Sequence, residues 1–228
     1  MYVAGTTDNE LTLQIIPIDA RLKQESIVPG SMDSLNSHEK LWTDMEYMQL
    51  TFDRMKEMKD KGYIQDTFLS DSYADAQEAL LTGTAAMYSQ ATWTYAELTK
   101  LAESQEELEN IGFFPIPATE AKDSIAYTET PTGFVVPKEG KKVDLAVQIV
   151  GELVTKEAMT EYYKMHQGIP AVNGVDVKLT SIPADVSALI EAGKTSTLPN
   201  TIYSTPSMAS DVQAMLAGDK TPKDVLEG

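Results

Sequence analysis

Helical periodicity alternates with short apolar runs along this chain, and the alternation restricts the possible folds more than any other feature. Between His38 and Lys61 the apolar residues recur at intervals of four and three, which is the spacing of one helix face. Two later runs, Ala85–Tyr88 and Ile111–Pro115, are short and apolar, and each follows a helical pattern. Because helices that alternate with buried strands pack as layers, we predict an α/β fold with both runs in one sheet.

Glycines and capping residues indicate where the predicted helices begin and end. Helices over 11–23 and 38–61 are expected to pack on the sheet through apolar stripes. We expect Ser37 to cap the second of these helices and Gly62 to end it, because glycine adopts the left-handed conformation that often follows a helix. Further helices are predicted over 71–80, 92–101, 143–154, 155–165, 181–192 and 206–216, and a further strand over 132–136.

The charge of the chain excludes several classes of partner. It contains 18 lysine and arginine residues against 35 aspartate and glutamate residues, a formal net charge of −17. Such a field repels phosphate backbones and anionic lipids, so we predict no nucleic-acid partner and no direct binding to a membrane surface. The segment Met1–Thr6 has neither the basic start nor the apolar stretch of a signal peptide. Either the protein is cytosolic, or the sequence begins downstream of its export signal.

Residues for catalysis or metal binding are sparse. The sequence has no cysteine and only two histidines, His38 and His166, which are too few for a histidine-based metal site. Adjacent tyrosines can bind ferric iron, but we favour a packing role for Tyr162 and Tyr163 on the rim of a helix. Carboxylates are abundant, so a glycosidase pair stays open as an alternative, although nothing singles out two of them. We predict a protein that is not an enzyme and that needs no cofactor or metal.

Trp93 is the residue that we favour as a ligand contact. It follows the apolar run 85–88 and a polar turn, Ser89–Thr92, at the start of a predicted helix. Turns at the carboxyl ends of strands are where α/β proteins bind ligands, and an indole ring offers an apolar platform to the C–H face of a sugar. Buried packing is the alternative for Trp93. Trp42 lies beside the apolar stripe of 38–61, and we expect it in the core.

A series of short motifs resembles the family 1 extracellular solute-binding proteins over nearly the whole chain. In order, they are Lys61-Gly62-Tyr63, Ser72–Ala76, Ala79–Tyr88, Trp93, Ile111–Pro117, Gly133–Lys138, Gly168–Ala171, Met215–Gly218 and Thr221-Pro222. Two positions depart from the family pattern. Ala91 replaces the glycine of its "G-x-W" motif, which leaves the orientation of Trp93 open, and Thr84 replaces the lysine of "G-K-A-A-M".

The resemblance implies a type II periplasmic-binding-protein-like fold. On the family pattern this chain holds mainly the C-terminal lobe, and the N-terminal lobe is largely missing. Residues 1–125 and 177–228 are then the C-terminal lobe, and 126–176 are a crossover segment that belongs to the N-terminal lobe. An apolar strand edge without a partner promotes association. We therefore expect 132–154 to be covered by the missing lobe or by a second chain, or to be more mobile than 38–117.

The resemblance also implies a function. It indicates capture of a carbohydrate, most plausibly an oligosaccharide, without catalysis, and its delivery to an ABC permease in the membrane. Trp93 would stack on the sugar, and Tyr203, Asn9 and Glu10 are further candidate contacts. The protein would work outside the cytoplasm, in the periplasm or as a lipoprotein at the cell surface. A same-fold protein for a non-sugar ligand and a carboxylate-based glycosidase are the alternatives.

Overall fold

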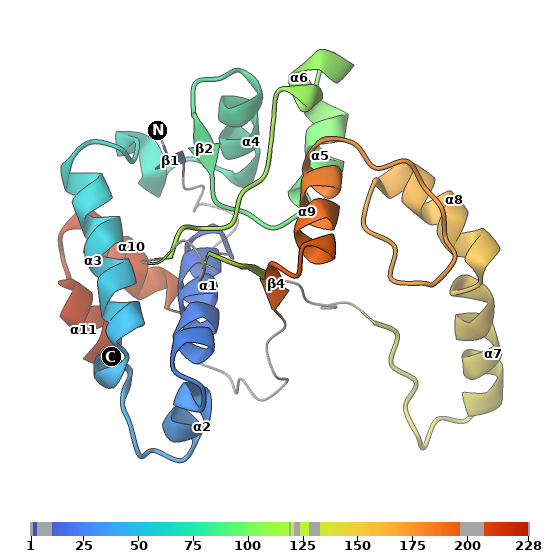
Figure 1. The fold of residues 1–228 in the computed structure, drawn as a ribbon, viewed down its shortest axis with the longest axis horizontal. Coiled ribbons are helices and arrows are strands. Elements are labelled where there is room, and N and C mark those ends of the chain that lie inside the picture. Colours follow the sequence, from blue (N-terminus) through green and yellow to red (C-terminus); the bar gives the residue numbers. More distant parts are fainter. Residues whose placement is uncertain are drawn as a thin grey trace. The chain divides into compact units, whose positions relative to one another are not determined.

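The structure is a computed structural model that describes residues 2–3, 11–118, 120, 124–127, 133–196 and 208–227 (Figure 1). The chain forms two compact units, each built from segments that are distant in sequence. Unit 1 consists of Met1–Ala91, Phe114–Tyr127 and Lys194–Gly228, and unit 2 consists of Thr92–Phe113 and Thr128–Gly193. The lobe boundaries expected from the family pattern stay a prediction.

Unit 1 combines helices with two small parallel sheets. Its helices are α1 (Leu11–Ile27), α2 (Ser31–Asn36), η1 (Trp42–Asp44), α3 (Glu46–Asp60), η2 (Asp66–Leu69), α4 (Tyr73–Leu81), α10 (Ala209–Ala217) and α11 (Pro222–Glu227). Its strands are β1 (Tyr2–Val3), β2 (Met87–Tyr88), β3 (Ala126–Tyr127) and β4 (Thr195–Ser196). Strand β1 pairs in parallel with β2, and β3 pairs in parallel with β4.

The core of unit 1 lies among α1, α3, α10 and α11, which pack against one another (Figure 1). Its buried residues are Ala20, Met45, Tyr47, Met48, Phe52, Met55, Ile64, Phe68, Met208, Ala209, Val212, Met215, Leu216, Val225 and Leu226. The buried residues of α3 include Met48, Phe52 and Met55 of the predicted stripe. Trp42 packs against this core and is half-buried, as its position beside the stripe predicts.

Unit 2 contains the helices α5 (Thr94–Leu101), α6 (Gln105–Glu109), α7 (Val143–Leu153), α8 (Lys156–His166) and α9 (Ser181–Glu191). Side-chain hydrogen bonds join its distant segments. The Ser181 hydroxyl oxygen lies 2.7 Å from the carbonyl oxygens of Leu108 and Ile111, so these two acceptors share its single proton. The Tyr95 hydroxyl lies 3.3 Å from the Thr180 hydroxyl. These bonds hold the start of α9 against α5 and against the end of α6.

The predicted helix 11–23 is confirmed and continues to Ile27, whereas the helix predicted over 38–61 begins later than expected. His38 has a φ of 59°, a left-handed conformation that cannot continue a helix, so α3 starts only at Glu46 and Ser37 does not cap it. The end of α3 is where the sequence predicts it, since Gly62 follows the helix with a φ of 71°.

The prediction of one sheet containing both apolar runs is wrong. Met87 and Tyr88 form β2, but Ile111–Pro115 forms no strand and lies outside both described sheets. The amide of Phe113 donates to the Asp185 carboxylate at 2.8 Å, so it is not available to a neighbouring strand. Pro115 has no amide hydrogen to donate. Residues 133–136 of the strand predicted over 132–136 also lie outside the described sheets.

Replacing Ser72 with alanine is expected to destabilise unit 1 by about 1 kcal/mol, because Ser72 caps α4. Its hydroxyl accepts from the amide of Asp75 at 3.1 Å, and its own amide donates to the Asp75 carboxylate at 2.8 Å. Denaturant unfolding measures the change. Ser70→Ala is the control, because the exposed Ser70 follows η2 and does not cap the start of a helix; its hydroxyl donates to the Thr67 carbonyl oxygen. A Ser72→Ala midpoint equal to that of the control would contradict the prediction.

The effect of Ser72→Ala is expected to depend on pH. Hydrogen bonds from the Ser72 hydroxyl and amide hold the pKa of the Asp75 carboxyl below its ordinary value. A carboxyl whose pKa is lower in the folded state stabilises the fold above its unfolded pKa, and it loses that contribution as pH falls through the folded pKa. The difference between wild type and Ser72→Ala should therefore be largest near neutral pH and shrink in acid.

Candidate functional site

The turn after β2 is held by side-chain hydrogen bonds. The side-chain amide nitrogen of Gln90 donates to the Tyr88 hydroxyl at 3.3 Å. The side-chain oxygen of Gln90 accepts from the amide of Ala91 at 2.9 Å. The ring of Tyr88 in turn lies 6.4 Å from the ring of Tyr73, between centroids. These contacts fix the backbone at the carboxyl end of β2, where α/β folds position ligand-binding groups.

Ser89 lies in the same turn with an unsatisfied hydroxyl. Its oxygen is buried and has no hydrogen-bond partner among the described residues. Buried polar atoms are nearly always paired, and leaving one unpaired costs roughly 1–3 kcal/mol. A water molecule or a hydroxyl-bearing ligand would remove that cost. Nothing in the sequence distinguishes Ser89 as a contact residue within the polar turn, because only its burial sets it apart from its neighbours.

Trp93 is at the N-terminal end of α5, and 48% of its surface is exposed. The helix behind it is anchored, because Tyr95 and Leu98 are almost fully buried in unit 2. The anchored helix therefore fixes the backbone of Trp93, while about half of the residue stays exposed to solvent. A half-exposed tryptophan is an apolar surface available for contact, and Trp93 as a ligand contact stays a prediction.

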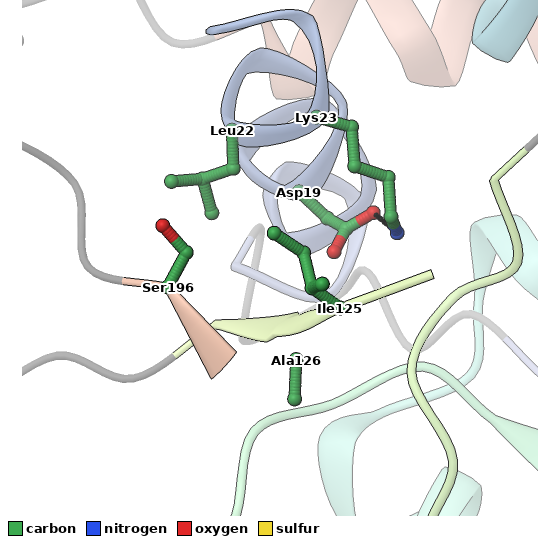
Figure 2. A pocket seen from close by; sticks show the side chains of 6 residues that line it. All are labelled: Asp19, Leu22, Lys23, Ile125, Ala126 and Ser196. Carbon is green, nitrogen blue, oxygen red and sulfur yellow. Dashed lines mark hydrogen bonds and ion pairs between the residues drawn. The ribbon is translucent and has the colours of Figure 1, made fainter. Parts of the chain in front are cut away.

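A second feature of unit 1 is a small hollow between α1 and the β3–β4 pair (Figure 2). It is lined by Asp19, Leu22, Lys23, Ile125, Ala126 and Ser196. Lys23 is 1% exposed, and its ammonium donates to the Asp19 carboxylate and to the carbonyl oxygen of Ile116. The hollow leaves no room for a water-sized sphere, so it is not a ligand site.

Desolvation dominates the electrostatics of this pair. Burial raises the pKa of the Asp19 carboxyl above its ordinary value, although the charge of Lys23 opposes the rise. Burial likewise lowers the pKa of the Lys23 ammonium, against the opposing effect of Asp19. For each group, the cost of removing its charge from water thus exceeds the stabilisation that its partner provides. The only signal of this pair in the sequence is an aspartate four residues before a lysine, beside the apolar stripe of 11–23.

Of the four predicted ligand contacts, the structure describes Trp93. Tyr203, Asn9 and Glu10 lie outside the described residues. The rings of Tyr162 and Tyr163 lie edge to face at 5.2 Å, and the Tyr163 hydroxyl accepts from the amide of Ala171; the packing role of the pair stays a prediction. Within the described residues, no group of three or more histidine and carboxylate side chains could hold a metal ion. The described helices also include none that is long and apolar enough to cross a membrane.

Comparison with known proteins identifies related sequences and folds. The model of a family described as bacterial extracellular solute-binding protein matches residues 30–190, more than half of the chain. A structure named chitin oligosaccharide binding protein is similar with a TM-score of 0.76 and 19% identity, over 99% of this chain and 57% of that one. A structure of the MsmE binding protein of Bacillus subtilis subsp. subtilis str. 168, in an open conformation, gives a TM-score of 0.69 and 13% identity, with the same two coverages.

These likenesses confirm the predicted periplasmic-binding-protein-like fold. The chain spans 57% of the length of each of the two solved structures. Among curated proteins, no sequence matches. At identities below a fifth, the structural likeness establishes the fold alone, because one fold carries many ligands.

Proposed function

Because this chain belongs to the family of bacterial extracellular solute-binding proteins, we propose that it captures a carbohydrate for an ABC importer, without catalysis. The half-exposed indole of Trp93, presented by an anchored helix just after the turn that follows β2, is the observation that carries the proposal. The name of one similar structure supports an oligosaccharide as the ligand, since that protein is named for chitin oligosaccharides.

Sugar capture needs the kind of groups that this part of the chain supplies. A pyranose ring has an apolar C–H face, which an indole covers, and a rim of hydroxyls, which polar side chains bind. We propose Trp93 as the stacking platform, and Tyr203, Asn9 and Glu10 as further contacts.

The proposal includes the arrangement of the complete receptor. Residues 1–125 and 177–228 would form one lobe, and 126–176 would cross into the other lobe. Hinge bending of two such lobes encloses a ligand. The apolar residues of 132–154 would then be covered by the N-terminal lobe, or by a second chain. The family description places such proteins outside the cell membrane, and we propose the periplasm or a lipid anchor at the cell surface, beside the permease.

Replacing Trp93 with alanine in the full-length protein is expected to weaken oligosaccharide binding by at least about tenfold, the cost of truncating a central aromatic contact. Calorimetric titration with linear β-1,4-linked and α-1,4-linked oligosaccharides measures it. Tyr63→Ala is the matched control, because Tyr63 is 55% exposed and belongs to the loop after α3. Its affinity should equal that of wild type.

Two results of this experiment would count against the proposal. Equal affinities of Trp93→Ala and Tyr63→Ala would remove Trp93 from the site, and no binding of any oligosaccharide would favour a non-sugar ligand. The oligosaccharides should also be recovered intact after prolonged incubation. Reproducible cleavage that a specific carboxylate substitution abolishes would instead support the glycosidase alternative.

A further inference from the structure

Strands β3 and β4 are the points at which the chain leaves unit 1 after Tyr127 and returns to it at Lys194. The two strands pair in parallel, with Ala126 opposite Thr195 and Tyr127 opposite Ser196. The amide of Ala126 donates to the Lys194 carbonyl oxygen at 3.0 Å. The whole segment 128–193 therefore begins and ends at one small pair of strands.

Helix α1 lies beside this pair of strands. Asp19, Leu22 and Lys23 are on one face of α1, and they line the hollow together with Ile125, Ala126 and Ser196 (Figure 2). The ammonium of Lys23 donates to the carbonyl oxygen of Ile116, 93 positions later in the chain, on the segment that leads toward β3. One buried cation thus connects α1 to the backbone that precedes β3, where the chain leaves unit 1 for the second time.

Stability alone does not account for a buried charge at this place. An ion pair removed from water gains little, and replacing such a pair with apolar side chains is often neutral or stabilising. What the apolar replacement cannot provide is a donor aimed at the Ile116 carbonyl. A directional bond of this kind fixes orientation, which apolar contacts do not.

We propose that Lys23 is a positioning residue, which Asp19 holds in place so that its ammonium fixes the backbone before β3 and, through it, the β3–β4 pair against α1. This goes beyond the proposed function, since it concerns the packing of the β3–β4 pair on α1 within unit 1 and holds whatever the ligand is.

The test uses hydrogen exchange and thermal unfolding of the 228-residue chain, without ligand. In Lys23→Met, the uncompensated Asp19 should lower the melting temperature, and the Ala126 amide should exchange about tenfold faster. In the double variant Asp19→Leu, Lys23→Met, the melting temperature should return close to that of wild type while the Ala126 amide stays about tenfold faster. Lys23→Arg should keep the protection of Ala126, because arginine still donates to a carbonyl oxygen.

A matched control is Lys56→Met, Asp60→Leu, which removes another ion pair at the same helical spacing, on the exposed face of α3. It should change neither the melting temperature nor the exchange of Ala126. The proposal is overturned if the double variant at α1 recovers both readouts, or if the Ala126 amide is unchanged in Lys23→Met. Since no sugar is present, either result leaves the Trp93 experiment to be decided on its own.

Discussion

In the 228-residue chain, the backbone amides of α7 are expected to exchange at least about a hundredfold faster than those of α3. Helix α7 has no buried side chain, and its apolar residues Val147 and Ile149 are 56% and 53% exposed. Its main packing partner is α8, which likewise has no buried side chain. An isolated helix of about a dozen residues is only marginally stable in water, so α7 needs tertiary packing to stay helical.

Helix α9 is the matched comparison for α7. Both helices have 11 residues and belong to unit 2, but α9 buries Ile182, Pro183 and Val186. The amides of α9 should therefore be markedly better protected than those of α7. If protection of α7 rises with protein concentration, a second chain covers the apolar face. Equal protection of both helices in a dilute monomer would show that the expected need for a cover over 132–154 is wrong.

Replacing Phe52 with alanine is expected to lower the free energy of unfolding by about 3–5 kcal/mol, the range for deleting a buried aromatic ring. Phe52 is fully buried in α3, where α1, α10 and α11 meet around the core of unit 1. The tight packing of helices on several sides leaves little room for collapse into the cavity. Urea unfolding of the chain measures the loss.

Phe134→Ala removes the same ring from a residue that is 66% exposed, and it is the control for Phe52→Ala. Exposed aromatic residues contribute little to folding, so this variant should stay within about 0.5 kcal/mol of wild type. A Phe52→Ala loss as small as that of the control would mean that α3 repacks, or that unit 1 does not unfold as one cooperative body.

The ends of helices were predictable because their signals are local. Gly62 follows α3 with a positive φ, as predicted, and Gly83 and Gly218 follow α4 and α10 in the same way. Ser72 and Thr155 supply capping hydroxyls at the starts of α4 and α8. Strands were not predictable in the same way, because a strand exists only where a partner lies beside it. The partners of β1 and β3 are more than 60 residues away, which no local pattern encodes.

In the candidate site, too, the features set by neighbours in sequence were predictable, and those set by distant contacts were not. The exposure of Trp93 follows from its place after a strand and a polar turn, and those are neighbours in sequence. The roles of Ser89 and Lys23 depend on burial and on distant backbone, since the carbonyl partner of Lys23 belongs to Ile116. Asn9, Glu10 and Tyr203 stay predictions, as they lie outside the described residues.

The two tryptophans of the chain are divided between the units, with Trp42 in unit 1 and Trp93 in unit 2. Their surroundings also differ, because Trp42 packs against a core and Trp93 faces solvent. Indole fluorescence shifts with the polarity around the ring, so the two residues should emit at separate wavelengths without any added dye. The tryptophan fluorescence of a Trp42→Phe protein would then come from unit 2 alone, and that of a Trp93→Phe protein from unit 1 alone. Unfolding, quenching and ligand titrations could therefore be followed in each unit separately.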